Sequence, residues 1–257
     1  MDLYTQQKLT VYDLVTKQPI GEEKRHIVHT SGLWHMSTVA YFLLKDPKDT
    51  IRVLVQKRSG DVDISKGLFD QSLATQRRDF DRNPEESLIR RSKEEYGLDL
   101  SSFPLKQYFL NTDLTISKFS PGEKNCEILN FFFAHTPEEE IQSKNLHADY
   151  ISDAFWINWS EMIRQIRTEP LIYTRTARLF CLNDEIVKYI EDSIQSFLFG
   201  KPMITEFPAS AIHFESVNPL TEEVYIQRKN GKIDWYQYDK KTTKLLRHEQ
   251  REHIVRS

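Results

Sequence analysis

The chain has 257 residues, of which 39% are hydrophobic and 28% are charged, and its formal net charge is -3. This length allows one elaborated domain, or one domain with a small appendage, around a substantial core. The slight negative charge gives no electrostatic case for binding nucleic acid or an anionic membrane surface. No apolar run approaches the roughly 20 residues that a membrane span needs.

Two further observations bear on the compartment. The first ten residues lack the charged and then apolar layout of a signal peptide. The sequence contains two cysteines, Cys126 and Cys181, which are too few for a disulfide framework or a structural zinc site and which we expect to pack in the core. We therefore expect a cytoplasmic protein.

The first quarter of the chain predicts strands. Residues 8–15 have a strand-like composition, a turn is expected around Pro19, and residues 26–28 predict a second short strand. A long apolar strand is expected over about 34–44. Apolar residues then alternate over 51–58, which predicts a half-buried strand.

Residues 83–98 predict one capped amphipathic helix. Asn83 can accept a hydrogen bond from a first-turn N–H, and Pro84 suits the first helical position because it lacks an N–H. Glu86 follows the cap at capping-box spacing, and Gly97 can adopt the left-handed conformation that ends a helix.

The polar face of this helix carries Arg91, Glu94 and Glu95 at i, i+3 and i+4. Two carboxylates fixed on one rigid face suit a hard divalent cation such as Mg²⁺, which takes oxygen ligands. The same spacing equally fits a solvated helix face on which Arg91 pairs with Glu95.

Together with the loop before it, the helix resembles the Nudix box, over the segment QRRDFDRNPEESLIRRSKEEYGL (76–98). The residues that match the signature in register are Arg90, Glu94, Glu95, Gly97 and Leu98. The resemblance implies an α/β/α sandwich with a mixed sheet, and Mg²⁺ or Mn²⁺ held by Glu94 and Glu95, which would also be catalytic.

Four positions depart from the signature. Gln76 stands where a Gly belongs, Arg82 where the first Glu belongs, and Ser92 where an aliphatic residue belongs. Arg91 stands where the family places its principal metal-binding and base-supplying Glu. A guanidinium cannot deprotonate, so Arg91 is neither a metal ligand nor a base. Either its charge replaces that of a cation and neutralises Glu95, or the site is no longer used.

Three shorter motifs, GLWH, VLVQKRS and GLFDQSLA, resemble the Nudix branch related to isopentenyl-diphosphate isomerase. In this comparison Arg58 would hold a substrate phosphate, unless it is a strand-end surface residue. Phe69, with Trp34 and Trp156, would stack on a nucleobase, unless these aromatic residues belong to the core. No Cys matches the one that the isomerases use before the box, so isomerase activity is not expected. A zinc site is not expected at the three histidines of residues 26–35.

Beyond the box, strands are predicted over 106–117 and 126–136, and another over 153–159. Ser160 is the predicted cap of a helix over 161–166, and a longer helix ends at Gly200.

The last part of the chain differs in composition. Residues 203–257 predict a β-meander with a hairpin at Asn230–Gly231. This segment extends the sheet, covers a pocket or forms a dimer; the sequence leaves these open.

We therefore predict a Nudix-type α/β fold over residues 1–200 with a C-terminal β extension over 201–257. The predicted function is hydrolysis of a nucleoside diphosphate linked to another moiety, with activity weakened or lost. The alternative is a non-catalytic Nudix-like module that binds a nucleotide or a protein partner. The predicted partner is a small nucleotide or diphosphate ligand, and a homodimer is left open.

Overall fold

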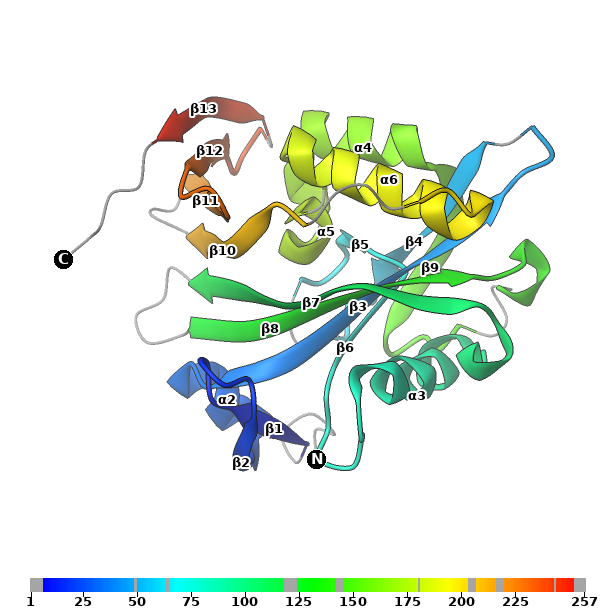
Figure 1. Ribbon diagram of the computed structural model, residues 1–257, viewed down its shortest axis with the longest axis horizontal. Helices are drawn as coiled ribbons and strands as arrows, with labels where there is room; N and C mark the ends of the chain where they lie inside the picture. Colours follow the sequence, from blue (N-terminus) through cyan, green and yellow to red (C-terminus); the bar gives the residue numbers. More distant parts are fainter. Residues whose placement is uncertain are drawn as a thin grey trace.

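One large mixed sheet with helices on both faces organises the protein (Figure 1). The structure is a computed structural model that describes residues 7–48, 50–62, 65–117, 124–141, 146–179, 181–202, 207–215, 220–242 and 244–251. The main path of the sheet runs β13-β12-β11-β10-β7-β8-β3-β1-β2; β4 and β6 pair with β3, and β5 and β9 pair with β4. The predicted α/β class and mixed sheet are confirmed.

The centre of the sheet consists of long apolar strands. Its members are β3 (Trp34–Lys45), β4 (Ile51–Arg58), β5 (Phe69–Asp70), β6 (Leu73–Gln76), β7 (Leu105–Ser117), β8 (Lys124–His135) and β9 (Ile151–Asn158). Strand β3 pairs parallel with β8 and antiparallel with β4 and β6. It is buried at every position from His35 to Leu44 because both faces of the sheet are covered.

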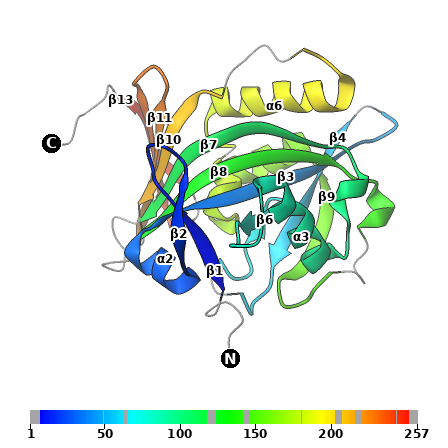
Figure 2. The same cartoon turned by 60° about the horizontal axis from the view of Figure 1, so that its bottom comes forward.

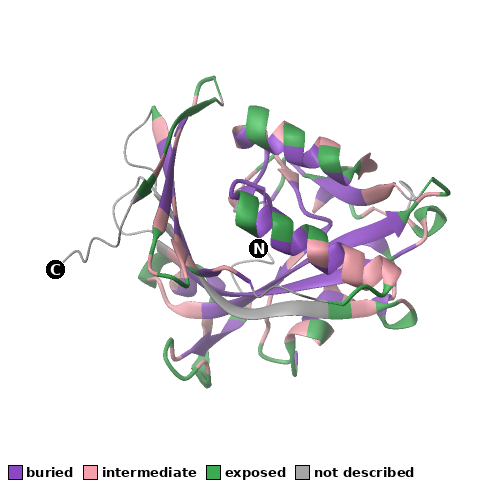
Figure 3. Ribbon diagram, turned by 45° about the horizontal axis from the view of Figure 1, so that its top comes forward, coloured by how far each residue is buried: buried purple, intermediate pink, exposed green. Residues whose placement is uncertain are grey.

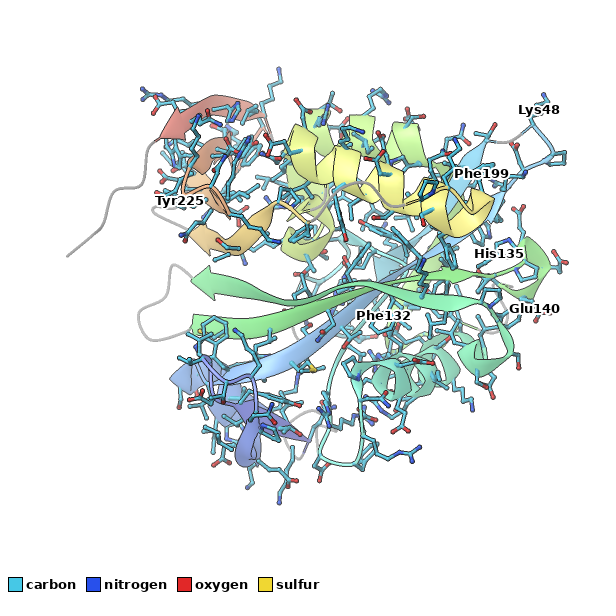
Figure 4. All side chains as sticks on the ribbon, in the orientation of Figure 1. Lys48, Phe132, His135, Glu140, Phe199 and Tyr225 are labelled. Atoms are coloured by element: carbon cyan, nitrogen blue, oxygen red, sulfur yellow. The ribbon has the colours of Figure 1, made fainter. Side chains whose placement is uncertain are left out.

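Alternate residues of β3 enter two separate cores, as the two-residue period of a strand requires. Tyr41 and Leu43 belong to the cluster that packs under α4 (Trp159–Thr168) and α6 (Asp184–Phe199). Phe42 belongs to the cluster under α3 (Pro84–Tyr96). Figure 2 shows α3 and α6 on opposite sides of the sheet, and in Figure 4 Phe132 and Phe199 mark these two sides.

The N-terminal segment contains a helix where a strand was expected. Strands β1 (Lys8–Tyr12) and β2 (Pro19–Lys24) pair antiparallel, and α2 (Arg25–Ser31) comes directly after them and ends at Gly32 in the left-handed region. The strand predicted over 26–28 is therefore wrong. Three residues are too few to separate the two periods, and the helix buries Val28 against β1.

The helices after β9 also differ in their boundaries. Helix α4 begins at Trp159 after an Asn158 cap, so Ser160 lies inside its first turn. The single long helix predicted next is divided into α5 (Arg175–Leu179) and α6, because the Asn183 side chain accepts hydrogen bonds from two backbone N–H groups and starts a new helix. Its predicted end at Gly200 is confirmed.

The described part of residues 201–257 continues the sheet. Strand β10 (Ala209–Glu215) pairs parallel with β7, and an antiparallel meander continues through β11 (Thr221–Arg228), β12 (Ile233–Asp239) and β13 (Leu245–Arg251). Val224 and Tyr236 share one hydrophobic cluster with Ile190 of α6. Figure 3 shows the buried residues running from the central strands into these C-terminal strands.

Three short 3₁₀ helices complete the described elements, at Leu100–Ser102, Glu138–Glu140 and Pro170–Ile172. Within the described ranges, no helix is both long and apolar enough to cross a membrane. Cys126 and Cys181 are buried and carry free thiols.

Candidate functional site

The loop from β6 to α3 is tied to the helix by Asp81. Its buried carboxylate accepts two hydrogen bonds of 2.9 Å from Arg90 Nε and Nη2, and further bonds from the Arg78 backbone N–H and the Ser87 hydroxyl. Burial acts to raise the pKa of Asp81, but the hydrogen bonds and charge of Arg90 outweigh it and the pKa is lowered. A carboxylate expected at position 82 is thus present one residue earlier, which the sequence comparison missed.

The helix caps form as predicted, with one shift. Asn83 Oδ1 accepts the Glu86 N–H at 2.9 Å, and Gly97 ends α3 at a φ of 66°. The Glu86 carboxylate, however, accepts the backbone N–H of Arg82 and its side-chain Nε, instead of the cap N–H of a capping box. This contact ties Arg82, at the end of the loop, to Glu86 in the first turn of α3.

Glu94 is surrounded by guanidinium groups. Arg78, Arg90 and Arg91 contact its carboxylate at 3.0, 3.2 and 3.2 Å. The half-buried position of Glu94 favours the neutral form, but the three positive charges outweigh burial and lower its pKa. Glu94 is therefore an ionised carboxylate whose oxygens are already bound.

Glu95 lies in a different environment, although it is the next residue. It is only 3% exposed, its Oε1 contacts Arg91 Nη2 at 2.5 Å, and its Oε2 has no hydrogen-bond partner within the described residues. Burial raises the pKa of Glu95 against the opposing charge of Arg91. The Arg91 guanidinium also lies 4.1 Å from the centre of the Tyr150 ring. The 2.5 Å contact shows that Arg91 and Glu95 form the ion pair that their i, i+4 spacing allows.

A cavity of about 300 Å³ lies beside this pair and is predominantly cationic. Its charged wall residues are five arginines and two carboxylates, namely Arg25, Arg58, Arg78, Arg91, Arg175, Asp70 and Glu127. Neither Glu94 nor Glu95 is among the described residues that line it. Arg91 therefore lines the cavity, whereas the resemblance to the Nudix box predicted that carboxylates of this helix would form the site.

Arg58 enters the same wall from the end of β4. Its Nη1 contacts the buried carboxylate of Asp70 at 3.2 Å, and Asp70 also accepts a hydrogen bond of 2.5 Å from the Thr174 hydroxyl. Burial raises the pKa of Asp70, and the charge of Arg58 opposes this rise. Thus β4, β5 and the start of α5 meet at one ion pair on the cavity wall.

Phe69 is turned toward aromatic neighbours. Its ring centre lies 5.6 Å from that of Phe155 and 5.5 Å from that of Tyr173, and Phe69 is not among the described residues that line the cavity. The stacking role of Phe69 stays a prediction.

Gln76, which stands at the expected Gly position, lines the cavity and contacts three other side chains. Its Oε1 accepts a bond from Arg25 Nε, and its Nε2 lies 2.9 Å from His29 Nε2 and 3.0 Å from His35 Nε2. His35 Nδ1 faces the Leu33 carbonyl, which can only accept, so the proton is on Nδ1 and Nε2 accepts from Gln76. Burial lowers the pKa of His35, which is consistent with this neutral ring.

The residues around Arg91 do not fit the divalent metal ion that the family resemblance implies. Three guanidinium groups bind Glu94 and Glu95, so a cation would have to approach or displace these positive charges to reach either carboxylate. Within the described ranges, no group of three or more His, Cys, Asp or Glu side chains is placed to hold a metal ion.

Comparisons with known proteins leave the family open. No family model matches the sequence, and no curated protein matches it. The structure is similar to DR0079 from Deinococcus radiodurans, with a TM-score of 0.47 and 12% identity over 62% of this chain and 88% of that one.

Two other similar structures are named as Nudix hydrolases. RenU from M. smegmatis gives a TM-score of 0.41 at 12% identity over 76% of this chain and 99% of that one. A protein from Alicyclobacillus acidocaldarius gives 0.42 at 14% over 60% and 94%. Every one of these TM-scores is below 0.5, so the function of this chain has to be inferred from its own geometry.

Proposed function

We propose that this chain is a Nudix-like protein that binds a nucleoside diphosphate linked to another moiety, and that its hydrolytic activity is weakened or lost. One observation carries the proposal: Arg91 binds both Glu94 and Glu95 and also lines the cationic cavity. A guanidinium thereby occupies the helix face on which the resemblance to the Nudix box places a metal ion.

The chemistry of the wall supports a phosphate ligand. Guanidinium groups present planar pairs of N–H donors that match two oxygens of a phosphate, and such charge-assisted bonds are stronger than neutral ones. Arg58 and Arg91 line the cavity from different elements, a strand and a helix. Two arginines from different elements are therefore available to the phosphates of a diphosphate group.

The same residues disfavour hydrolysis. A general base must be within hydrogen-bond reach of the attacking water. Glu94 is bound by three arginines, and Glu95 is buried outside the cavity wall and paired with Arg91. Neither carboxylate is placed to take a proton from a water molecule inside the cavity.

One observation favours a second candidate, a working metal-dependent hydrolase with relocated ligands. Glu95 Oε2 is a buried acceptor with no partner within the described residues, and such a group is costly unless something binds it. Asp70 and Glu127 would supply further oxygens from the cavity wall. This candidate requires Arg91 to move away from Glu95 when the metal ion binds.

Calorimetric titration with ADP-ribose and with inorganic pyrophosphate in EDTA tests the proposal. We expect wild-type protein to bind both ligands without metal, and Arg91→Gln to weaken binding by tenfold or more. Arg82→Gln is the matched control, because Arg82 is an exposed arginine of the same loop that pairs with Glu86 away from the cavity wall. Its affinity should equal that of wild type.

Product analysis after incubation of ADP-ribose with Mg²⁺ or Mn²⁺ separates the two candidates. Intact ligand is expected. Hydrolysis that Glu95→Gln abolishes would establish the second candidate. Absence of binding for both ligands, in the presence and absence of metal, would refute the proposed function.

A further inference from the structure

The C-terminal extension reaches the cavity wall through one buried carboxylate. Glu222 of β11 is 3% exposed, and its Oε2 accepts a hydrogen bond of 2.7 Å from Arg178 Nη1. Its Oε1 accepts a short bond from Arg175 Nε. Both arginines belong to α5, which precedes the extension in the chain.

One of these two arginines belongs to the cavity. Arg175 lines the wall together with Thr174, whose hydroxyl donates to Asp70 and accepts the Ala177 N–H at 3.2 Å. Asp70 in turn binds Arg58. The first turn of α5 is therefore held between Glu222 on one side and the Arg58 ion pair on the other.

We propose that Glu222 is a positioning residue of the anion pocket, which fixes the Arg175 guanidinium at the cavity wall. The ligand class in this inference rests on the proposed function. The C-terminal extension is then a required part of the pocket, since its strand supplies the anchor of a wall residue.

The physical reason is that an arginine side chain has several rotatable bonds. If the ligand has to order this side chain, the lost conformational entropy lowers the affinity for the ligand. A buried carboxylate orders it in advance. Burial alone would raise the pKa of Glu222, but the charges of Arg178 and Arg175 outweigh burial and lower the pKa to about 2. The anchor is therefore charged throughout the neutral range.

The extension offers a matched control in Asp234 of β12, which is 1% exposed. Its carboxylate binds Asn183 and, at 2.7 Å, Arg228 Nε. None of these three residues is among the described residues that line the cavity. Asp234→Asn thus removes an equally buried charge of the same extension without touching an arginine of the pocket.

Titration with inorganic pyrophosphate tests the inference. Glu222→Gln should weaken binding by about fivefold or more, whereas Asp234→Asn should lower the melting temperature and leave the dissociation constant unchanged. In an Arg175→Gln background, Glu222→Gln should cause no further loss, because Glu222 acts through Arg175. Equal losses from both carboxylate variants, or full additivity with Arg175→Gln, would overturn the inference.

A second readout separates this inference from the proposed function. If wild type binds neither pyrophosphate nor ADP-ribose, with or without metal, the proposed function fails, and amide hydrogen exchange over 174–178 tests the positioning role alone. Glu222→Gln should accelerate exchange there and Asp234→Asn should not. Should Glu222→Gln fail to fold, Glu222→Asp is the alternative variant, since it keeps the charge on a shorter side chain that lies farther from Arg175. Unchanged affinity and unchanged exchange in that variant would overturn the positioning role.

Discussion

Replacing Arg91 by Gln isolates the ion pair on which the proposed site depends. The substitution removes the guanidinium that contacts Glu95 at 2.5 Å and Glu94 at 3.2 Å, and Glu95 is only 3% exposed in the wild-type structure. Removing one partner of a buried ion pair costs about 3–5 kcal/mol, because the other charge is left without compensation. We therefore expect Arg91→Gln to lower the free energy of unfolding by about 3 kcal/mol at pH 8.

The loss of stability in Arg91→Gln should increase with pH, because Glu95 is buried. Burial already raises the pKa of Glu95 against the charge of Arg91, and removing that charge raises it further. The folded variant then holds a proton more tightly than the unfolded chain, whose Glu pKa is about 4.3. Its stability falls as pH rises from that value through the raised folded pKa, so the deficit grows with pH.

Urea unfolding between pH 4.5 and 8.5 measures this deficit in wild type, Arg91→Gln, Glu95→Gln and the double variant. The double variant should be more stable at pH 8 than the sum of the single losses predicts, since no buried charge is left unpaired. A deficit that does not change with pH, together with additive single losses, would refute the view that Arg91 compensates Glu95. Arg82→Gln, at an exposed pair of the same region, should unfold like wild type.

Three other outcomes are expected. Asn83→Ala should cost about 1 kcal/mol in urea unfolding through loss of the cap bond to the Glu86 N–H, and a stability equal to wild type would contradict the cap. Asp81→Asn should cost about 2 kcal/mol at pH 7, because Arg90 loses its buried charged partner and keeps its contact with Glu94. Since the pKa of Asp81 is lowered, its contribution is present above about pH 3.9 and lost in acid, so the variant and wild type should converge as pH falls. Limited proteolysis should leave residues 201–257 intact until global unfolding, and rapid loss of this segment at an unchanged melting temperature would show an independent tail.

What the sequence predicted well is local. The caps and length of α3 result from Asn83, Pro84 and Gly97, whose effects act within one turn of the helix. The apolar period identified β3 and β4 because both strands are long. The strand predicted over 26–28 failed because a three-residue pattern fits a helix as well, and burial of its Val28 against β1 decided the outcome.

What the sequence missed depends on partners that are distant along the chain. Gln76 looks like a lost Gly until its contacts with Arg25 and His29, 51 and 47 residues away, are known. Likewise Arg175 binds Glu222 at a separation of 47 residues, which no local pattern indicates. The cationic wall of the cavity is a tertiary property and had no signature in the order of residues.

The departures from the Nudix signature divide by physical role. Asp81 binds Arg90 and holds the loop on the helix, one residue before the position at which the resemblance places a carboxylate. Arg91 occupies the position at which the resemblance places a metal-binding carboxylate, and its guanidinium forms ion pairs with Glu94 and Glu95. The first set of contacts fixes the loop to the helix, and the second places a guanidinium on the cavity wall. A guanidinium carries its positive charge without a metal ion, but it cannot activate a water molecule, which is the reason for proposing binding without cleavage.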